Sequence, residues 1–171
     1  YIAYIGRLSY EKGYDLLVEV ARKHPEIKFR FAGAQREQKN TDIPSNVEFA
    51  GYLQKDKLLE FIQKARFIVI PSRCYEGFPM AILEAACHGK PAIASNHGGF
   101  TEIIGQGENA IGKLFEPGNT DDLDKQIAEL WNNQTLTEEL GEKAFRKLKK
   151  HYDSEVVYKQ WETLFSKLKN S

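Results

Sequence analysis

Short apolar runs alternate with amphipathic segments along the first 95 residues of the chain. Runs rich in β-branched and aromatic residues occupy 1–5, 27–33, 47–52, 67–71 and 91–95. Segments with helical spacing of apolar residues occupy 14–24, 56–65 and 79–89. Strand and helix in alternation predict parallel strands joined by right-handed crossovers, with helices on both faces of one sheet.

The predicted fold is therefore α/β, a Rossmann-like three-layer domain. Within it, the run FIVI at 67–70 predicts a central strand that is buried on both faces. Gly13, Gly89 and Gly105 fall where the predicted helices begin or end.

The last third of the chain is helical in pattern, with helices expected at about 120–132, 137–151 and 154–169. In the last of these, apolar residues recur at steps of four, three and four, and they form one stripe: Val157, Trp161, Leu164 and Leu168. The stripe either covers the core of this domain or packs on a partner domain. The first alternative is the more common one.

Length and charge narrow the class of protein. A chain of 171 residues suits a single domain. Its 24 Lys plus Arg balance 24 Asp plus Glu, so no global basic field gathers nucleic acid, and any anion site is local. The opening residues YIAYIG read as a strand with no preceding turn, cap or methionine, which suggests a piece of a longer protein.

The two cysteines and the apolar runs bear on the compartment. Cys74 and Cys87 lack metal-ligand spacing, which argues against zinc and disulfides and fits a reducing, cytoplasmic setting with buried or half-buried thiols. The longest apolar runs are far shorter than the ~20 residues that span a bilayer, and no signal-peptide pattern opens the chain.

Candidate chemistry gathers in three loops, because ligands of doubly wound sheets bind beyond the carboxyl ends of the strands. The first loop is GRLSYEKG, residues 6–13. Gly6 allows close backbone approach to a ligand, while Arg7 and Lys12 suit phosphate oxygens. The glycine spacing matches neither a dinucleotide fingerprint nor a P-loop, and pairing of the two cations with Glu11 or Asp15 is an equally good interpretation.

The second loop, EGFPMAILE at residues 76–84, leads into a helix. Pro79 suits the first helical position, so the free amides of the helix point into the crevice, where a phosphate would fit. Glu76 precedes the helix and Glu84 lies more than one turn inside it. They therefore do not form the paired acid and base of a glycosidase, but they can bind two different diols of one extended ligand.

The third loop, SNHGGFTEIIGQG at residues 95–107, offers another close backbone approach at Gly98 and Gly99. His97 is a candidate base, although a lone loop histidine is more often an ordinary polar residue.

Together these motifs resemble the donor-binding half of retaining glycosyltransferases of family 4, the large GT-B group. Three motifs within residues 6–119 carry this resemblance. They are GRLSYEKG, then EGFPMAILEAACHGKPAIAS with two glutamates eight positions apart, then GGFTEII followed by GKLFEPGN. The resemblance implies that residues 1–171 are a C-terminal domain that binds a nucleotide sugar linked to UDP, GDP or ADP. It implies transfer with retention to an acceptor sugar or lipid-linked sugar, in the synthesis of a polysaccharide, lipopolysaccharide or glycolipid, without an essential metal or another cofactor.

By position, the resemblance assigns roles to individual residues. Arg7 and Lys12 match the pair that neutralises the donor diphosphate and stabilises the leaving nucleoside diphosphate, next to Gly6. Glu76 matches the glutamate that holds the donor sugar, and Glu84 the one that binds the ribose diol.

Gly77, Phe78 and Pro79 then supply the tight turn and backbone contacts beside that sugar. Leu53 lies where the family packs the nucleobase. Of a Gly-x-Gly turn that is frequent in the family, only Gly33 of GAQRE is present. ENAIGKL replaces the usual Asn-Gly before the late strand.

The acceptor-binding N-terminal domain is absent from the sequence, so the isolated chain is expected to bind donor and to catalyse little. The full-length enzyme is expected in the cytoplasm, with peripheral attachment to the inner face of the membrane as an option. Two alternatives stay open: a GT-B nucleotide-sugar epimerase and a non-catalytic nucleotide-binding module.

Overall fold

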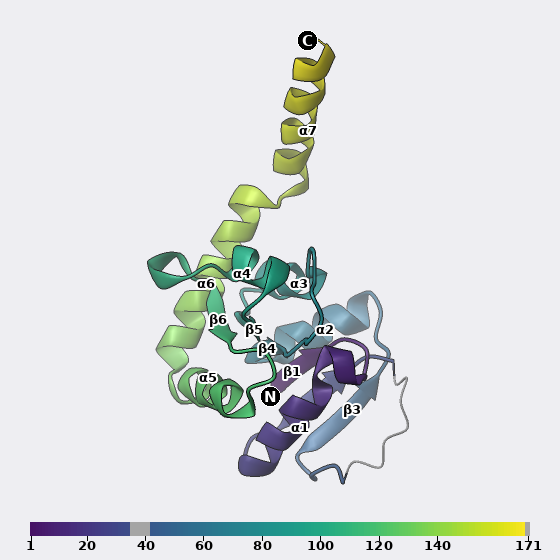
Figure 1. The fold of residues 1–171 in the computed structure, drawn as a ribbon, viewed down its shortest axis with the longest axis vertical. Coiled ribbons are helices and arrows are strands. Elements are labelled where there is room, and N and C mark those ends of the chain that lie inside the picture. The colour runs from purple at the N-terminus through teal and green to yellow at the C-terminus, as the bar shows by residue number, and fades with distance from the viewer. Residues whose placement is uncertain (35–41, 170–171) are drawn as a thin grey trace.

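The computed structural model describes residues 1–34 and 42–169, and its strands form one parallel sheet (Figure 1). The strand order is β3-β2-β1-β4-β5-β6, and every neighbouring pair is parallel. The strands are β1 (Ile2–Ile5), β2 (Phe29–Ala32), β3 (Val47–Gly51), β4 (Phe67–Ile70), β5 (Ala92–Ser95) and β6 (Gly112–Phe115). The order reverses direction between β1 and β4, which is where doubly wound sheets bind their ligands.

Helices cover both faces of this sheet. They are α1 (Tyr14–Lys23), α2 (Asp56–Lys64), α3 (Met80–Cys87), α4 (Gly98–Ile104), α5 (Thr120–Asn132), α6 (Gln134–His151) and α7 (Ser154–Lys169), with two 3₁₀ turns, η1 (Tyr10–Lys12) and η2 (Gly107–Asn109). Buried residues of α1 and α5 share one hydrophobic cluster with Tyr4 and Phe31 of the sheet. Buried residues of α2, α3, α4 and α6 share the other with Ala3 and Ile68. The predicted three-layer α/β fold is confirmed.

Strand β4 lies at the centre of the sheet, between β1 and β5. All four of its residues are buried, as predicted for FIVI. Successive side chains point to opposite faces of a strand. Accordingly Phe67 and Val69 belong to the first cluster, and Ile68 and Ile70 to the second.

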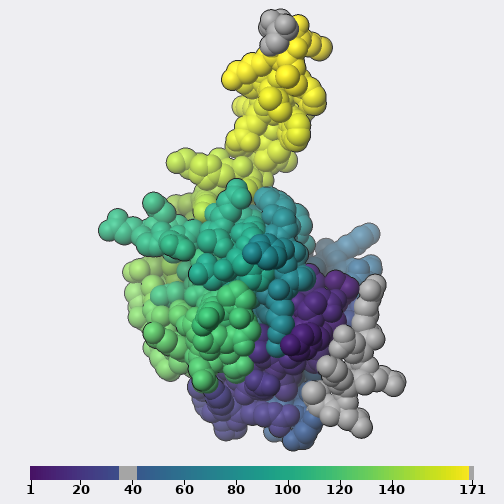
Figure 2. All heavy atoms as spheres, in the orientation of Figure 1, coloured from purple at the N-terminus to yellow at the C-terminus, as the bar shows by residue number. Residues whose placement is uncertain are grey.

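Helix α7 leaves the body of the molecule and extends alone (Figures 1 and 2). None of its side chains is buried. The exposed fractions of Trp161 and Leu168 are 54% and 64%. The prediction that the α7 stripe covers the core of this domain is therefore wrong, because the helix turns away at residues 152–153 before it reaches either face of the sheet.

Within the described ranges, no helix is both long enough and apolar enough to cross a membrane. The two thiols are free there. Cys74 is half-buried as expected, whereas Cys87 is exposed.

Candidate functional site

The three predicted loops meet at the carboxyl edge of the sheet. The first follows β1, the second follows β4, and the third follows β5. Backbone hydrogen bonds join them: the amide of Arg73 donates to the carbonyl of Glu11 (2.8 Å), and the amide of Gly99 donates to the carbonyl of Glu76 (2.8 Å). Residues that lie far apart in sequence therefore come together along this edge of the sheet, which we call the crevice.

Close backbone approaches fix the positions of these loops. Gly13 has a φ of +69°, and a Cβ there would lie 1.8 Å from the carbonyl oxygen of Pro71. A Cβ on Gly99 would lie 2.3 Å from the carbonyl oxygen of Gly77. Such distances are far below van der Waals contact, so only glycine lets the backbones come this close.

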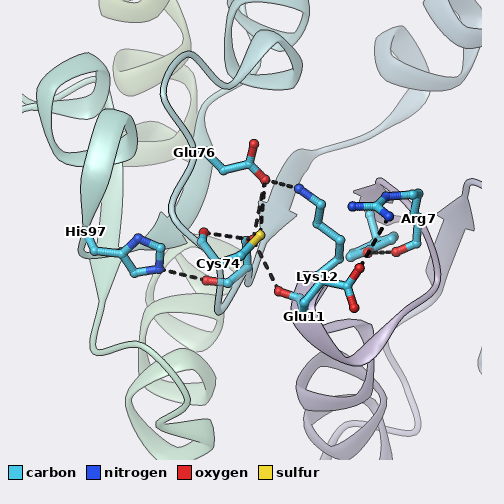
Figure 3. Close-up of polar contacts among 8 residues, drawn as sticks. Arg7, Glu11, Lys12, Cys74, Glu76 and His97 are labelled. Carbon is cyan, nitrogen blue, oxygen red and sulfur yellow. Dashed lines mark hydrogen bonds and ion pairs between the residues drawn. The ribbon is translucent and has the colours of Figure 1, made fainter.

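Lys12 and Glu76 form an ion pair between the first and second loops (Figure 3). Lys12 lies on η1 after β1, and Glu76 lies in the loop before α3, 64 residues further along. The exposed fractions of the two side chains are 19% and 24%. Ser72 Oγ donates to the same Glu76 oxygen at 3.4 Å, and Cys74 Sγ lies 3.9 Å from it. The structure thus brings together the cation of the first motif and the first glutamate of the second.

Arg7 lies on the other side of the same turn and is more exposed. Its guanidinium pairs with Glu11 at 3.3 Å, with 41% of the side chain exposed. The backbone of Arg7 is fixed by Tyr4, whose hydroxyl donates to the Arg7 carbonyl at 2.6 Å. Burial raises the pKa of the Tyr4 phenol far above its usual value, so this hydrogen-bond donor stays protonated.

Arg73 joins the loop that carries Glu76 to the turn that carries Lys12. Its guanidinium donates to both carboxylate oxygens of Asp15 (2.8 and 2.9 Å) and to the carbonyl of Tyr10 (2.6 Å). It also lies 4.0 Å from the centre of the Tyr10 ring. The alternative that the two cations of the first loop pair with Glu11 or Asp15 is confirmed for Arg7 with Glu11. It is wrong for Asp15, because Arg73 takes both of its oxygens.

Helix α3 begins at Met80, one residue later than predicted. Pro79 is the N-cap, with φ −74° and ψ +93°, and its carbonyl accepts the amide of Ile82. The first turn still presents free amides, so the expected anion-binding end of the helix is preserved. Glu84 lies in the second turn, is half-buried, and makes no ion pair within the described residues.

Two apolar residues of the predicted site lie near the surface. Phe78 is 53% exposed, and its ring centre lies 5.7 Å from that of Tyr152. Leu53 is half-buried against the second hydrophobic cluster. Gly77 is exposed, and no atom would lie within 4 Å of a Cβ added there.

Gly33 packs directly on Gly6. A Cβ on Gly33 would lie 1.7 Å from the Gly6 carbonyl oxygen, and the Gly33 amide donates to the carbonyl of Gly51 at 2.8 Å. Gly33 therefore allows the loops after β1 and β2 to touch. Residues 35–37, which complete the predicted GAQRE turn, lie outside the described residues.

His97 braces the second loop in this structure. Its Nε2–H donates to the carbonyl of Ser72 at 2.9 Å, and its ring lies between those of Tyr75 and Phe100, with centres 4.9 and 5.6 Å away. The opposite nitrogen, Nδ1, is buried and has no hydrogen-bond partner among the described residues. In this arrangement His97 holds the loop that carries Ser72.

Across the two described ranges, no three His, Cys, Asp or Glu side chains are grouped in a way that could hold a metal ion. The crevice can bind an anion through Arg7, Lys12 and the first turn of α3, and hydroxyl groups through Glu76 and Glu84.

Comparison with known proteins identifies the relatives of this chain. The family described as "Glycosyl transferases group 1" matches residues 1–147. An uncharacterized glycosyltransferase of Methanocaldococcus jannaschii is 35% identical over 145 residues, which are 81% of this chain and 40% of the relative. The chain therefore spans less than half the length of this relative.

Solved structures share the fold. The Anabaena protein HepE in complex with UDP has a TM-score of 0.82 at 22% identity, over 96% of this chain and 48% of HepE. A variant of TarM from S. aureus, in complex with UDP among other ligands, has a TM-score of 0.80 at 26% identity, over 96% of this chain and 35% of TarM.

Proposed function

Since the chain belongs to the group 1 glycosyl transferases, we propose that it is the C-terminal, donor-binding domain of a retaining family 4 enzyme with the GT-B fold. In this proposal the domain binds a nucleotide-diphosphate sugar. A second, N-terminal domain supplies the acceptor, and the sugar is transferred with retention to an acceptor sugar or lipid-linked sugar. The observation that carries the proposal is the meeting of Lys12 and Glu76 at the carboxyl edge of the sheet.

The electrostatics of the crevice support a diphosphate ligand. When a nucleoside diphosphate leaves, negative charge develops on its phosphate oxygens and must be stabilised by groups already in place. Arg7 and Lys12 supply two cations, and the free amides of the first α3 turn add the positive end of a helix. These groups can do this work without a metal ion. The TarM complex with UDP, at 26% identity, also supports a nucleoside diphosphate.

The carboxylates fit the rest of such a donor. Glu76 lies beside Lys12, so a sugar attached to the diphosphate can donate its hydroxyl groups to it. Glu84 is half-buried further along α3 and makes no ion pair within the described part, which leaves its oxygens available to the diol of a ribose. We assign the nucleobase to the region of Gly33 and Leu53, and the backbone beside the sugar to Gly77, Phe78 and Pro79.

Helix α7 supports the existence of a second domain. Its exposed apolar side chains line a helix that no other part of the described chain covers: Tyr158, Trp161, Leu164, Phe165 and Leu168. Exposed apolar patches of this kind mark interaction surfaces. We therefore infer that α7 packs on the acceptor-binding domain. We also place the protein in the cytoplasm, which the two free thiols support.

Calorimetric titration with UDP, GDP and ADP, each free and as a sugar conjugate, tests the proposal. At least one of them should bind the chain. The variant Lys12→Ala should weaken binding of the nucleoside diphosphate about tenfold or more, since a charge-assisted hydrogen bond contributes about 1.5–3 kcal/mol. Binding of the free nucleoside should be unaffected.

The matched control is Lys23→Ala, at the far end of α1, where the ammonium pairs with Asp121 at 2.8 Å. This variant should bind like the parent chain. The proposal fails if the folded chain binds no nucleotide. The role of Lys12 fails if Lys12→Ala weakens the binding of diphosphate and of nucleoside equally. An assay of the full-length enzyme for donor hydrolysis or 2-epimerisation separates transfer from epimerase chemistry.

A further inference from the structure

A basic pocket lies between α6 and the segment around η2, and none of the predicted donor-binding residues lines it. Its volume is about 400 Å³. We call it the α6 pocket, and its walls are Lys143, Arg146, Lys147, Lys150 and His151 on one side and Glu108, Asn109 and Ile111 on the other.

Four cations line the pocket from one face of the helix. Lys143, Arg146, Lys147 and Lys150 follow one another at steps of three, one and three, which places them on neighbouring turns of a single face. Because like charges three or four residues apart destabilise a helix, this spacing is unfavourable for α6 itself. Because the whole chain carries no net charge, this cluster is a local concentration of positive charge.

Three acids lie near these four cations: Glu108 lines the pocket, Glu142 pairs weakly with Arg146, and the charge of Glu102 acts on Lys147. The guanidinium of Arg146 lies 3.5 Å from Glu142, at the limit of a hydrogen bond, and both side chains are about 70% exposed. Lys150 makes no ion pair among the described residues, whereas its neighbour Lys149 is paired with Asp153 at 3.1 Å.

Two of the ammonium groups donate to backbone carbonyls outside α6, one in α4 and one in η2. Lys147 donates to the carbonyl of Ile103 at 2.7 Å, and Lys143 donates to that of Glu108 at 3.3 Å. Partial burial lowers the pKa of Lys147, so an anion beside it would favour its charged form. The Lys147 ammonium therefore turns toward α4 and is partly buried, whereas Lys143, Arg146 and Lys150 are exposed.

We propose that the α6 pocket binds a phosphate group of a ligand other than the sugar donor. A phosphate presents several strong acceptor oxygens, and a guanidinium with two or three ammonium groups supplies matching charge-assisted donors. The same group occurs on soluble phosphate esters and on the headgroups of anionic lipids. The proposal is independent of the donor function, because it rests on different residues.

The first arm of the test follows the amide signals of the ¹⁵N-labelled chain during titration with inorganic phosphate, against potassium chloride at equal ionic strength. The titration is done in the Lys12→Ala variant, which weakens the donor crevice. The amide signals of residues 107–111 and 143–151 are expected to shift saturably with phosphate concentration. The double variant Arg146→Ala with Lys150→Ala should weaken binding at least about tenfold, and the matched control Lys149→Ala should leave it unchanged.

The second arm measures co-sedimentation of the chain with vesicles of phosphatidylglycerol and of phosphatidylcholine. Binding to phosphatidylglycerol alone that is lost in the double variant assigns the site to a lipid headgroup. Saturable phosphate binding without vesicle binding assigns it to a soluble ester. The proposal is overturned if neither probe binds, if binding persists in the double variant, or if phosphate shifts only residues 6–12 and 72–80.

Discussion

Breaking the ion pair between Lys12 and Glu76 is expected to loosen the crevice and to destabilise the chain. At an effective dielectric constant of about 20, two unit charges in contact attract by about 4 kcal/mol. The rotamer entropy lost in fixing two long side chains and their partial desolvation offset more than half of this attraction. With 19% and 24% of the side chains exposed, we expect a net coupling of about 1–2 kcal/mol.

A double-mutant cycle measures this coupling. The free energy of unfolding is determined in urea for the parent chain, Lys12→Ala, Glu76→Ala and the double variant. The matched control is the cycle for Lys64 and Glu60, an i,i+4 pair that is 62% exposed on both sides, where about 0.3–0.5 kcal/mol is expected. A Lys12–Glu76 coupling no larger than that of the control would refute the reasoning, because backbone contacts alone would then position the two loops.

Four further outcomes follow from the structure. Gly33→Ala should lower the free energy of unfolding in urea by about 1–3 kcal/mol, because its Cβ would collide with a carbonyl 1.7 Å away, whereas Gly77→Ala should fold as well as the parent. Two basic side chains lower the pKa of Glu48 below 4.5. The stability that Glu48 contributes is therefore present at neutral pH and lost as the pH falls below that value, so in acid titrations followed by circular dichroism Glu48→Gln should lose less stability than the parent. Deletion of residues 154–171 should shift the melting temperature by only about 1–2 °C, because α7 buries no side chain, and a large drop would contradict the description of α7. If the donor proposal holds, Glu76→Gln should bind UDP several-fold more tightly in calorimetry, because the competing carboxylate no longer holds Lys12; unchanged or weaker binding would argue against competition.

The fold could be predicted from local sequence patterns, because apolar runs form the elements that become buried. β-branched runs such as FIVI pack well on a sheet that is covered on both faces, and glycine at positions such as 13 and 105 ends helices because it tolerates positive φ. Because all strands are parallel, their carboxyl ends meet at one edge. The three candidate loops therefore came together as expected, without any knowledge of which side chains would touch.

The polar contacts within the site were not predictable in the same way. An ion pair such as that of Lys12 with Glu76 depends on how two loops are placed in space, and sequence periodicity carries no signal for it. Arg73 was missed for this reason, although it joins the two loops. The spacing of the α7 stripe left two surfaces open, because an apolar face has the same spacing whichever partner it meets.

The glycine contacts that hold the crevice loops have a consequence for protein engineering. Backbone contacts at these glycines position the loops together with the Lys12–Glu76 pair, so the exposed side chains at the rim contribute less to keeping them in place. Phe78 and Met80 are more than half exposed, and Tyr75 is 82% exposed. A library that randomises these positions would vary the ligand preference of the crevice on an unchanged frame, which makes this edge of the sheet a natural starting point for directed evolution.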